Sequence, residues 1–302
     1  MKLLVIAVLL APAALAQGDL EGFWTNATNT PLERPASVNG REFHTDEEMA
    51  ANAEKARQPA DIAALAGTDI HYDFTQYGLD PSQSQQHLGR RTSIIVDPPD
   101  GKLPPLIPEA RQRAAARAEA RKKVGQFDGP ETRPLTERCI IWPGEGPPML
   151  PEAYNSEMQI HQGPGYVAIF QEMIHDVRII PLDGSPHPGP KIRQYMGDSR
   201  GHWEGRTLVV DTTNFNGRTN FRGSTENLHV IERFTRVDAD SILYEFTVED
   251  PQTWPKPWKG ELIMTKTEGP IFEYACHEGN YGMANTLSGA RAAEAEAGEK
   301  NK

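Results

Sequence analysis

The sequence has very few cysteines, the residues that form crosslinks and hold structural zinc. Its 302 residues include only two cysteines, Cys139 and Cys276, and the short paired spacing of cysteine zinc sites does not occur. The Walker glycine loop, His-Glu-x-x-His and the dinucleotide fingerprint are also absent. These absences argue against nucleotide enzymes and zincins, and we expect neither a metal nor a cofactor.

Positive charge is also scarce. The 31 lysines and arginines are outnumbered by 42 acidic residues, which gives a formal net charge of −11. Nucleic acids require a basic face on the protein, and anionic lipids attract basic segments. We therefore expect no nucleic-acid partner and no membrane surface as the main partner.

Long apolar runs are missing except at the start of the chain. Leu3 to Leu10 is apolar and is followed by Pro12 and by Ala14-Leu15-Ala16, which is the layout of a secretory signal peptide over residues 1–16. The run is too short to anchor the chain in a membrane. We expect no lipid anchor and no membrane insertion, and an exported, soluble protein that is periplasmic or extracellular.

Export would place both cysteines in an oxidising compartment. The expectation is a disulfide between Cys139 and Cys276 that closes a very long loop of chain. The alternative is a pair of inert, buried thiols.

The N-terminal part mixes one strand with helical segments. Gly22-Phe23-Trp24 predicts a first strand. Thr45 and Glu48 form the pattern of a capping box, which opens a helix that ends before Pro59. Further elements are expected at 60–67 (helix), 92–96 (strand) and 108–125 (surface helix).

From residue 156 onward the pattern changes to short strands separated by tight turns. The expected strands include one continuous strand over 166–180 and a last one that runs from 270 into His277. This spacing predicts a mainly β fold, an antiparallel meander that forms a barrel or a sandwich. We expect one β-rich domain over 17–285 with a partly helical insert, and a frayed, charged helical tail over 286–302.

Two resemblances accompany this prediction. Gly22-Phe23-Trp24 followed by an antiparallel meander resembles the start of lipocalin-like or calycin barrels, although the partly helical insert departs from a simple lipocalin. The run GDSRGHWEGRTLVVDTTNFN at 197–216, together with ERFTRVD and EYACHEGNYG, resembles a group of exported bacterial proteins with no assigned activity. The first resemblance implies a barrel, and the second implies export alone.

Alternation along the strands selects the candidate catalytic residues, because neighbouring side chains point to opposite faces. On 166–180, His175 falls among apolar neighbours, where it is either a core histidine or an acid or base that faces a ligand. Glu172, Asp176 and Arg178 share the other face. Glu232 lies in an apolar row and is either a general acid or base, or a structural partner of an arginine such as Arg178 or Arg200.

Further candidates for ligand binding lie in loops and on the last expected strand. Arg200 and Trp203 belong to a glycine-punctuated loop that suits a sugar or an aromatic ring, although Trp203 could equally close the barrel end. Trp254 lies in a stiff prolyl segment, which is either a lid or a packed connection. On the last strand, alternation separates Cys276 from His277 and pairs His277 with Glu273.

Two functions of different class fit these residues. The first is an exported, cofactor-independent acid-base enzyme (a lyase, isomerase or hydrolase) that acts on a small organic or sugar-derived molecule through His175, Glu232, Arg178 and Asp176. The second is a non-catalytic binder of a small apolar or glycan ligand. The enzyme requires His175 and Glu232 to lie within reach of each other or of one cavity.

Overall fold

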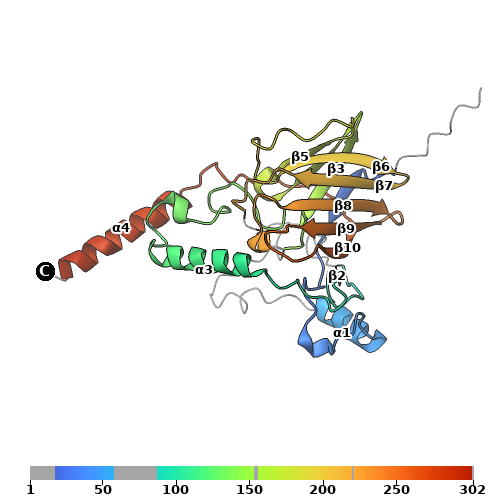
Figure 1. Cartoon of the computed structure of the whole chain (residues 1–302), viewed down its shortest axis with the longest axis horizontal. Helices are drawn as coiled ribbons and strands as arrows, with labels where there is room; N and C mark the ends of the chain where they lie inside the picture. Colours follow the sequence, from blue (N-terminus) through green and yellow to red (C-terminus); the bar gives the residue numbers. More distant parts are fainter. Residues whose placement is uncertain (1–17, 58–86, 153–155, 220, 301–302) are drawn as a thin grey trace, which may run out of the picture.

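The computed structural model describes residues 18–57, 87–152, 156–219 and 221–300. The expected signal peptide and the expected helix at 60–67 lie outside these residues. A ten-stranded antiparallel sheet dominates the described part (Figure 1). Its strands are β1 (Gly22–Thr25), β2 (Ile95–Asp97), β3 (Glu157–Gly163), β4 (Tyr166–Gln171), β5 (Val177–Pro181), β6 (Asp198–Glu204), β7 (Thr207–Thr213), β8 (His229–Arg236), β9 (Ser241–Glu249) and β10 (Trp258–Lys266).

The sheet curls into a nearly closed barrel. The order around it is β5-β4-β3-β1-β10-β9-β8-β7-β6, with β2 added to β10. Apart from β2, the neighbours follow chain order, and the first strand pairs antiparallel with the last. The predicted antiparallel barrel is therefore confirmed, and its strand order is consistent with the calycin-like architecture that the Gly-x-Trp resemblance implied.

The barrel has one seam, between β5 and β6. Each of the nine strands in the order runs antiparallel to its neighbour. Because nine is odd, the two end strands run in the same direction, and no backbone ladder joins them in the described part of the chain. The seam is narrow near Gly201, where an added Cβ would lie 2.7 Å from the Cγ2 of Ile180 on β5.

The interior of the barrel is filled by side chains. Strand β9, and β8 up to Thr235, alternate between half-buried and buried positions. Phe234, Tyr244 and Phe246 form a run of tilted aromatic contacts along the inside. Burial of each large apolar side chain contributes about 1.5–3 kcal/mol. The middle of the barrel is therefore core rather than cavity.

One end of the barrel carries tight hairpins and is closed. Gly205, with φ of +61°, occupies the first position of a two-residue loop between β6 and β7, where a type II′ turn needs positive φ. Trp24 is fully buried at this end. Its Nε1 donates to the Leu20 carbonyl at 2.9 Å, and the Arg236 guanidinium lies 4.9 Å from its ring centroid.

The opposite end carries the long connections. These are the β4–β5 turn, which includes the short 3-10 helix Met173–His175, and residues 214–228 and 250–257. An irregular segment that precedes β3 also covers this end, and the Cys139–Cys276 disulfide fastens it to the chain that follows β10. The predicted disulfide is thus present, and it closes a separation of 137 residues.

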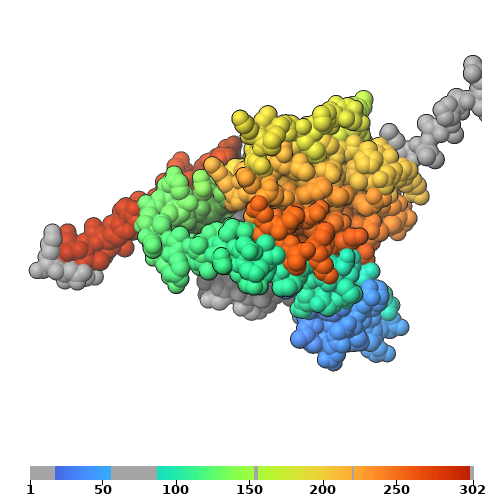
Figure 2. Space-filling model, in the orientation of Figure 1, coloured from blue at the N-terminus to red at the C-terminus, as the bar shows by residue number. Residues whose placement is uncertain are grey.

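Among the described residues, three α-helices lie outside the barrel. Helix α1 (Asp46–Arg57) begins with the predicted capping box, because the Glu48 N–H donates to Thr45 Oγ1 at 3.3 Å and the Thr45 N–H donates to Glu48 Oε2 at 2.9 Å. Helix α3 is Pro108–Lys122 and follows the predicted start. Helix α4 (Gly282–Lys300) stands clear of the barrel (Figure 2), and it is continuous where a frayed tail was expected.

Two expected strands are wrong. The stretch 166–180 is a hairpin, because Ile174 and His175 adopt left-handed backbone conformations, with φ of 59° and 52°, and reverse the chain between β4 and β5. The stretch after Lys266 is not a strand. The place beside β10 is already taken by β1, so residues 267–277 have no free edge to join next to the strand that they follow. In the described part of the chain, no helix is both long and apolar enough to cross a membrane.

Candidate functional site

An open cavity of about 570 Å³ lies at the end of the barrel with the long connections. Its lining is mainly apolar and aromatic, and it draws on several segments that are distant in sequence. Prominent members are Ile94, Ile141, Trp142, Leu150, Phe215 and Phe221. A concave, apolar site with a few polar groups is the usual form of a small-molecule pocket.

Residues 134–152, named the wall segment here, form one side of this cavity. Prolines at 134, 143, 147, 148 and 151 keep it out of regular helix or strand. The wall segment is bonded to the barrel core where the Met149 N–H donates to Tyr244 Oη at 2.8 Å. Cys139 ties it to Cys276, so the wall is held at two separate points.

Polar groups of the cavity cluster around Glu152 and Arg222. Burial raises the pKa of Glu152, and attraction to Arg222 partly offsets this rise. The indole N–H of Trp142 is buried without a hydrogen-bond partner in the described part of the chain. The cavity therefore combines an apolar lining with one carboxylate, Glu152, and one guanidinium, Arg222.

Arg178 and Glu232 form a buried ion pair inside the barrel. The Arg178 guanidinium donates to both carboxylate oxygens of Glu232, with Nη1 at 3.0 Å from Oε1. Its Nε donates to Ser199 Oγ on β6 at 3.0 Å, and Tyr244 Oη donates to Glu232 Oε1 at 2.8 Å. The structural pairing weighed for Glu232 is confirmed, and its partner is Arg178.

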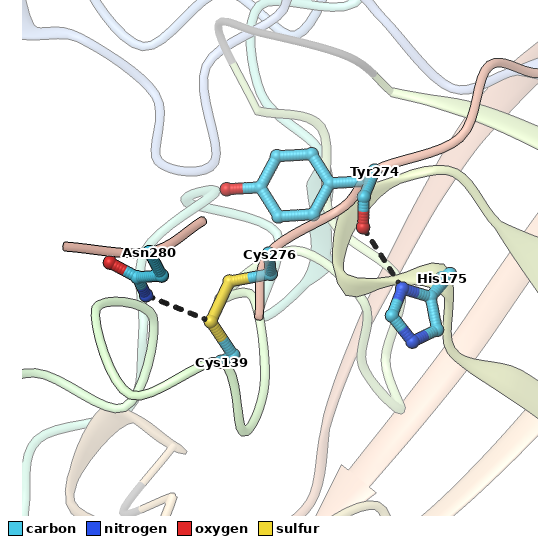
Figure 3. Close-up of a disulfide and its surroundings, with 5 residues drawn as sticks. All are labelled: Cys139, His175, Tyr274, Cys276 and Asn280. Atoms are coloured by element: carbon cyan, nitrogen blue, oxygen red, sulfur yellow. Dashed lines mark hydrogen bonds between the residues drawn. A yellow bond between two sulfur atoms is a disulfide. The ribbon is translucent and has the colours of Figure 1, made fainter. Parts of the chain in front are cut away.

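His175 is not part of an apolar row. The turn that breaks 166–180 places His175 on the surface, where its Nδ1 lies 3.0 Å from the Tyr274 carbonyl oxygen (Figure 3). Glu232 has no exposed surface. The structure therefore does not bring His175 and Glu232 together, either directly or around one cavity.

The two acidic candidates of the β4–β5 turn, Glu172 and Asp176, make local contacts around this turn. Glu172 is buried, its Oε2 accepts a bond from the Phe272 N–H at 3.1 Å, and burial raises its pKa. Asp176 is half-buried beside Glu145, and burial raises the pKa of Asp176 as well. Glu172 thus anchors the chain after β10 rather than forming a surface charge row with Asp176 and Arg178.

The other candidates are distributed over the molecule. Arg200 lies on the outer side of β6 and is paired with Asp198 at 2.8 Å. Trp203 packs against the core near the hairpin end, and Trp254 is buried against Trp258 in a packed connection. Glu273 and His277 are exposed next to the disulfide, away from the apolar cavity, because the expected last strand does not form.

The wall segment contains the site residues that the sequence analysis missed. Its signal was available: Ile140-Ile141-Trp142 and Met149-Leu150 are apolar groups set between prolines. Such a stretch cannot build a regular element, so its apolar side chains must pack against a preformed surface. In the described residues, no group of three or more histidine, cysteine, aspartate or glutamate side chains is placed to hold a metal ion.

Comparison of the chain with protein-family models, with curated proteins and with solved structures gives no match.

Proposed function

We propose that this chain is an exported, non-catalytic binding protein for a small, mainly apolar organic ligand. The observation that carries the proposal is the open cavity at the long-connection end of the barrel, with its apolar lining and its Glu152–Arg222 group. A volume of about 570 Å³ falls within the range of pockets for small ligands.

Export is part of this proposal. It is supported by the apolar N-terminal run of the sequence and by a disulfide, which persists in oxidising compartments. The cavity depends on that disulfide, because Cys139 lies within the wall segment.

An acid-base enzyme is the less favoured function. The residues expected to act together are separated, with His175 on the surface and Glu232 held in an ion pair inside the core. A general acid or base must reach the proton that it transfers, and neither group lines the apolar cavity.

The test is a titration of the mature protein with two fluorescent probes, neutral N-phenylnaphthylamine and anionic anilinonaphthalene sulfonate. Leu135→Trp should fill the cavity and weaken binding of both probes by about tenfold or more, a loss of about 1.4 kcal/mol. Val237→Trp, at an exposed position beyond β8, is the matched control and should bind as the wild type does.

Arg222→Gln separates the two probes. It should weaken the sulfonate more than the neutral amine, because it removes the cation of the cavity. Saturable binding that neither Leu135→Trp nor Arg222→Gln alters, or no saturable binding at all, would remove the basis of the proposal.

A further inference from the structure

The seam between β5 and β6 leaves one edge of β5 without a partner. The Gln171 N–H donates to the Asp176 carbonyl at 2.9 Å, and the Leu182 N–H donates to the Gly165 carbonyl at 2.9 Å. These bonds lie at the two ends of the β4–β5 ladder. Since bonded pairs alternate along an antiparallel ladder, Arg178 and Ile180 bond to β4, and the backbone groups of Val177 and Ile179 point into the seam.

The same two residues also present apolar side chains to solvent. Val177 is 52% exposed and Ile179 is 53% exposed, because the outer face of β5 is uncovered. Proteins usually protect a free strand edge with lysine, proline, a bulge or a covering segment. The stretch Val177–Ile179 has none of these protections in the described part of the chain.

An open groove of about 900 Å³ runs along this edge. One wall is Asp176–Ile179, and the other is residues 193–199. The second wall is fixed, because Gln194 donates from its N–H to the Asn214 carbonyl at 3.0 Å and accepts from the Asn216 N–H at 2.8 Å. Toward the hairpin end the seam closes where Ile180 approaches Gly201, so the groove accepts only a short stretch of chain.

The charges that line the groove are not all compensated. Arg178 is balanced by Glu232 and Asp198 by Arg200, whereas Asp176 lies beside Glu145, a second acid that cannot balance it. Arg218 is exposed and has no ion pair in the described part of the chain. Arg193 pairs with Glu226 at 3.6 Å. On the wall opposite Asp176, Arg218 is therefore a positive charge that no carboxylate of the described residues balances.

We infer that this groove binds an extended, acidic segment of another protein, which adds as a strand to the free edge of β5. Strand addition uses main-chain hydrogen bonds for affinity and side-chain contacts for specificity. The added strand bonds to the backbone of Val177 and Ile179, covers their side chains, and places a carboxylate beside Arg218 and Arg193. The groove is distinct from the ligand cavity, since Tyr195 is the one described residue that lines both spaces.

The probe is a fluorescent, N-acetylated hexapeptide that alternates valine and glutamate, titrated against the mature protein. Two further peptides carry N-methyl groups on all valines or on all glutamates, which removes the N–H donors of one edge at a time. One methylated peptide should bind as the parent does, and the other should lose about tenfold in affinity or more. No binding of the parent peptide, or equal binding of all three, would overturn the inference.

Three protein variants complete the experiment. Ile179→Pro removes an N–H that points into the seam and leaves the β4 ladder intact, so it should abolish peptide binding while the far-ultraviolet circular dichroism stays unchanged. Arg218→Glu should weaken the acidic peptide and improve binding of its valine-lysine counterpart. Val237→Thr, another exposed apolar position, is the control; if it weakens the peptide as much as Ile179→Pro does, binding is non-specific and the inference is wrong.

Discussion

Inside the barrel, the charges of Arg178 and Glu232 compensate each other. Arg178 comes from one end strand, and it contacts Ser199 on the other end strand and Glu232 on β8. A buried pair gains from mutual attraction roughly what it loses in desolvation, whereas one partner left alone keeps the desolvation cost. The pair therefore holds the two edges of the seam in place more than it adds net stability.

The first prediction concerns this pair. Arg178→Met and Glu232→Leu should each lower the free energy of unfolding by about 3–5 kcal/mol, and the double variant should recover most of that loss. Urea unfolding of the wild type, the two single variants and the double variant measures the coupling energy between Arg178 and Glu232. Additive losses in the double variant would contradict the interpretation of Arg178 as the partner of Glu232.

Glu145 is the second residue with a testable charge state. It is almost fully buried, and burial raises its pKa to about 9, opposed by the Trp142 N–H and assisted by repulsion from Asp176. The folded protein thus holds this proton more tightly than the unfolded chain does. The contribution of Glu145 to stability is therefore full below the unfolded pKa, and it is lost as pH rises toward the folded pKa.

The second prediction follows from this pH dependence of stability. Between about pH 5 and about pH 8 the wild type should lose on the order of a few kcal/mol from this group. Glu145→Gln should flatten the profile and be more stable than the wild type at the upper pH. Denaturant unfolding across this pH range measures the free energy of unfolding of each protein, with the exposed Glu131→Gln as control. Parallel pH profiles for the wild type and Glu145→Gln would exclude a protonated Glu145.

At the scale of elements, the wall segment is the least regular part of the site and depends on its attachments. The disulfide lies between the wall segment and the chain that leaves β10 (Figure 3), and Asn280 Nδ2 donates to the Cys139 sulfur at 3.5 Å. Closing so long a loop stabilises the fold by on the order of 4–5 kcal/mol in the chain-entropy account.

The third prediction tests the role of this attachment. Cys139→Ser combined with Cys276→Ser should lower the melting temperature and also weaken binding of N-phenylnaphthylamine, because the wall segment then loses its attachment to the chain after β10 and keeps its bonds at Glu145 and Met149. Fluorescence titration below the melting range separates the two effects. A destabilised variant with unchanged probe affinity would show that the disulfide does not shape the cavity.

The sequence predicts elements well where their pattern and their place in the sheet agree. In β8 and β9 the alternation of side chains correctly predicts that Glu232 points into the barrel. The expected arginine partner is also correct, because Glu232 pairs with Arg178. Alternation fails at 166–180, where no glycine, proline or asparagine marks the left-handed turn at Ile174 and His175. It fails again after Lys266, where alternation suits a strand. The edge of β10 is already occupied by β1, and no local sequence pattern reveals this.

The candidate site was harder to predict for a related reason. Its lining comes from the wall segment and from the β7–β8 connection, and these meet only through the closure of the barrel. Alternation identifies which residues point inward, but it does not show that the interior is filled to the level of Tyr244. The cavity is therefore a property of the assembled end of the barrel.

At the scale of the whole molecule, β5 and β6 are not joined by a ladder, so backbone groups along the seam have no partner strand among the described residues. This gives the fourth prediction, an alternating pattern of amide hydrogen exchange along β5. The amides of Arg178 and Ile180 should be protected by their bonds to β4, and those of Val177 and Ile179 should exchange much faster. Residue-resolved exchange by NMR measures the pattern, and uniform protection along β5 would mean that the seam is closed by hydrogen bonds.

The seam also divides the chain into two halves. Strands β1 to β5 lie before it and β6 to β10 after it, and the only covalent links across it are the connection at 182–197 and the disulfide. The halves remain paired through β10, which bonds to both β1 and β2. A single protease cut in that connection should leave two fragments that migrate as one species. A reducing agent and a denaturant together should then separate them. The two halves of the chain would in that case behave as complementary fragments that are encoded as one polypeptide.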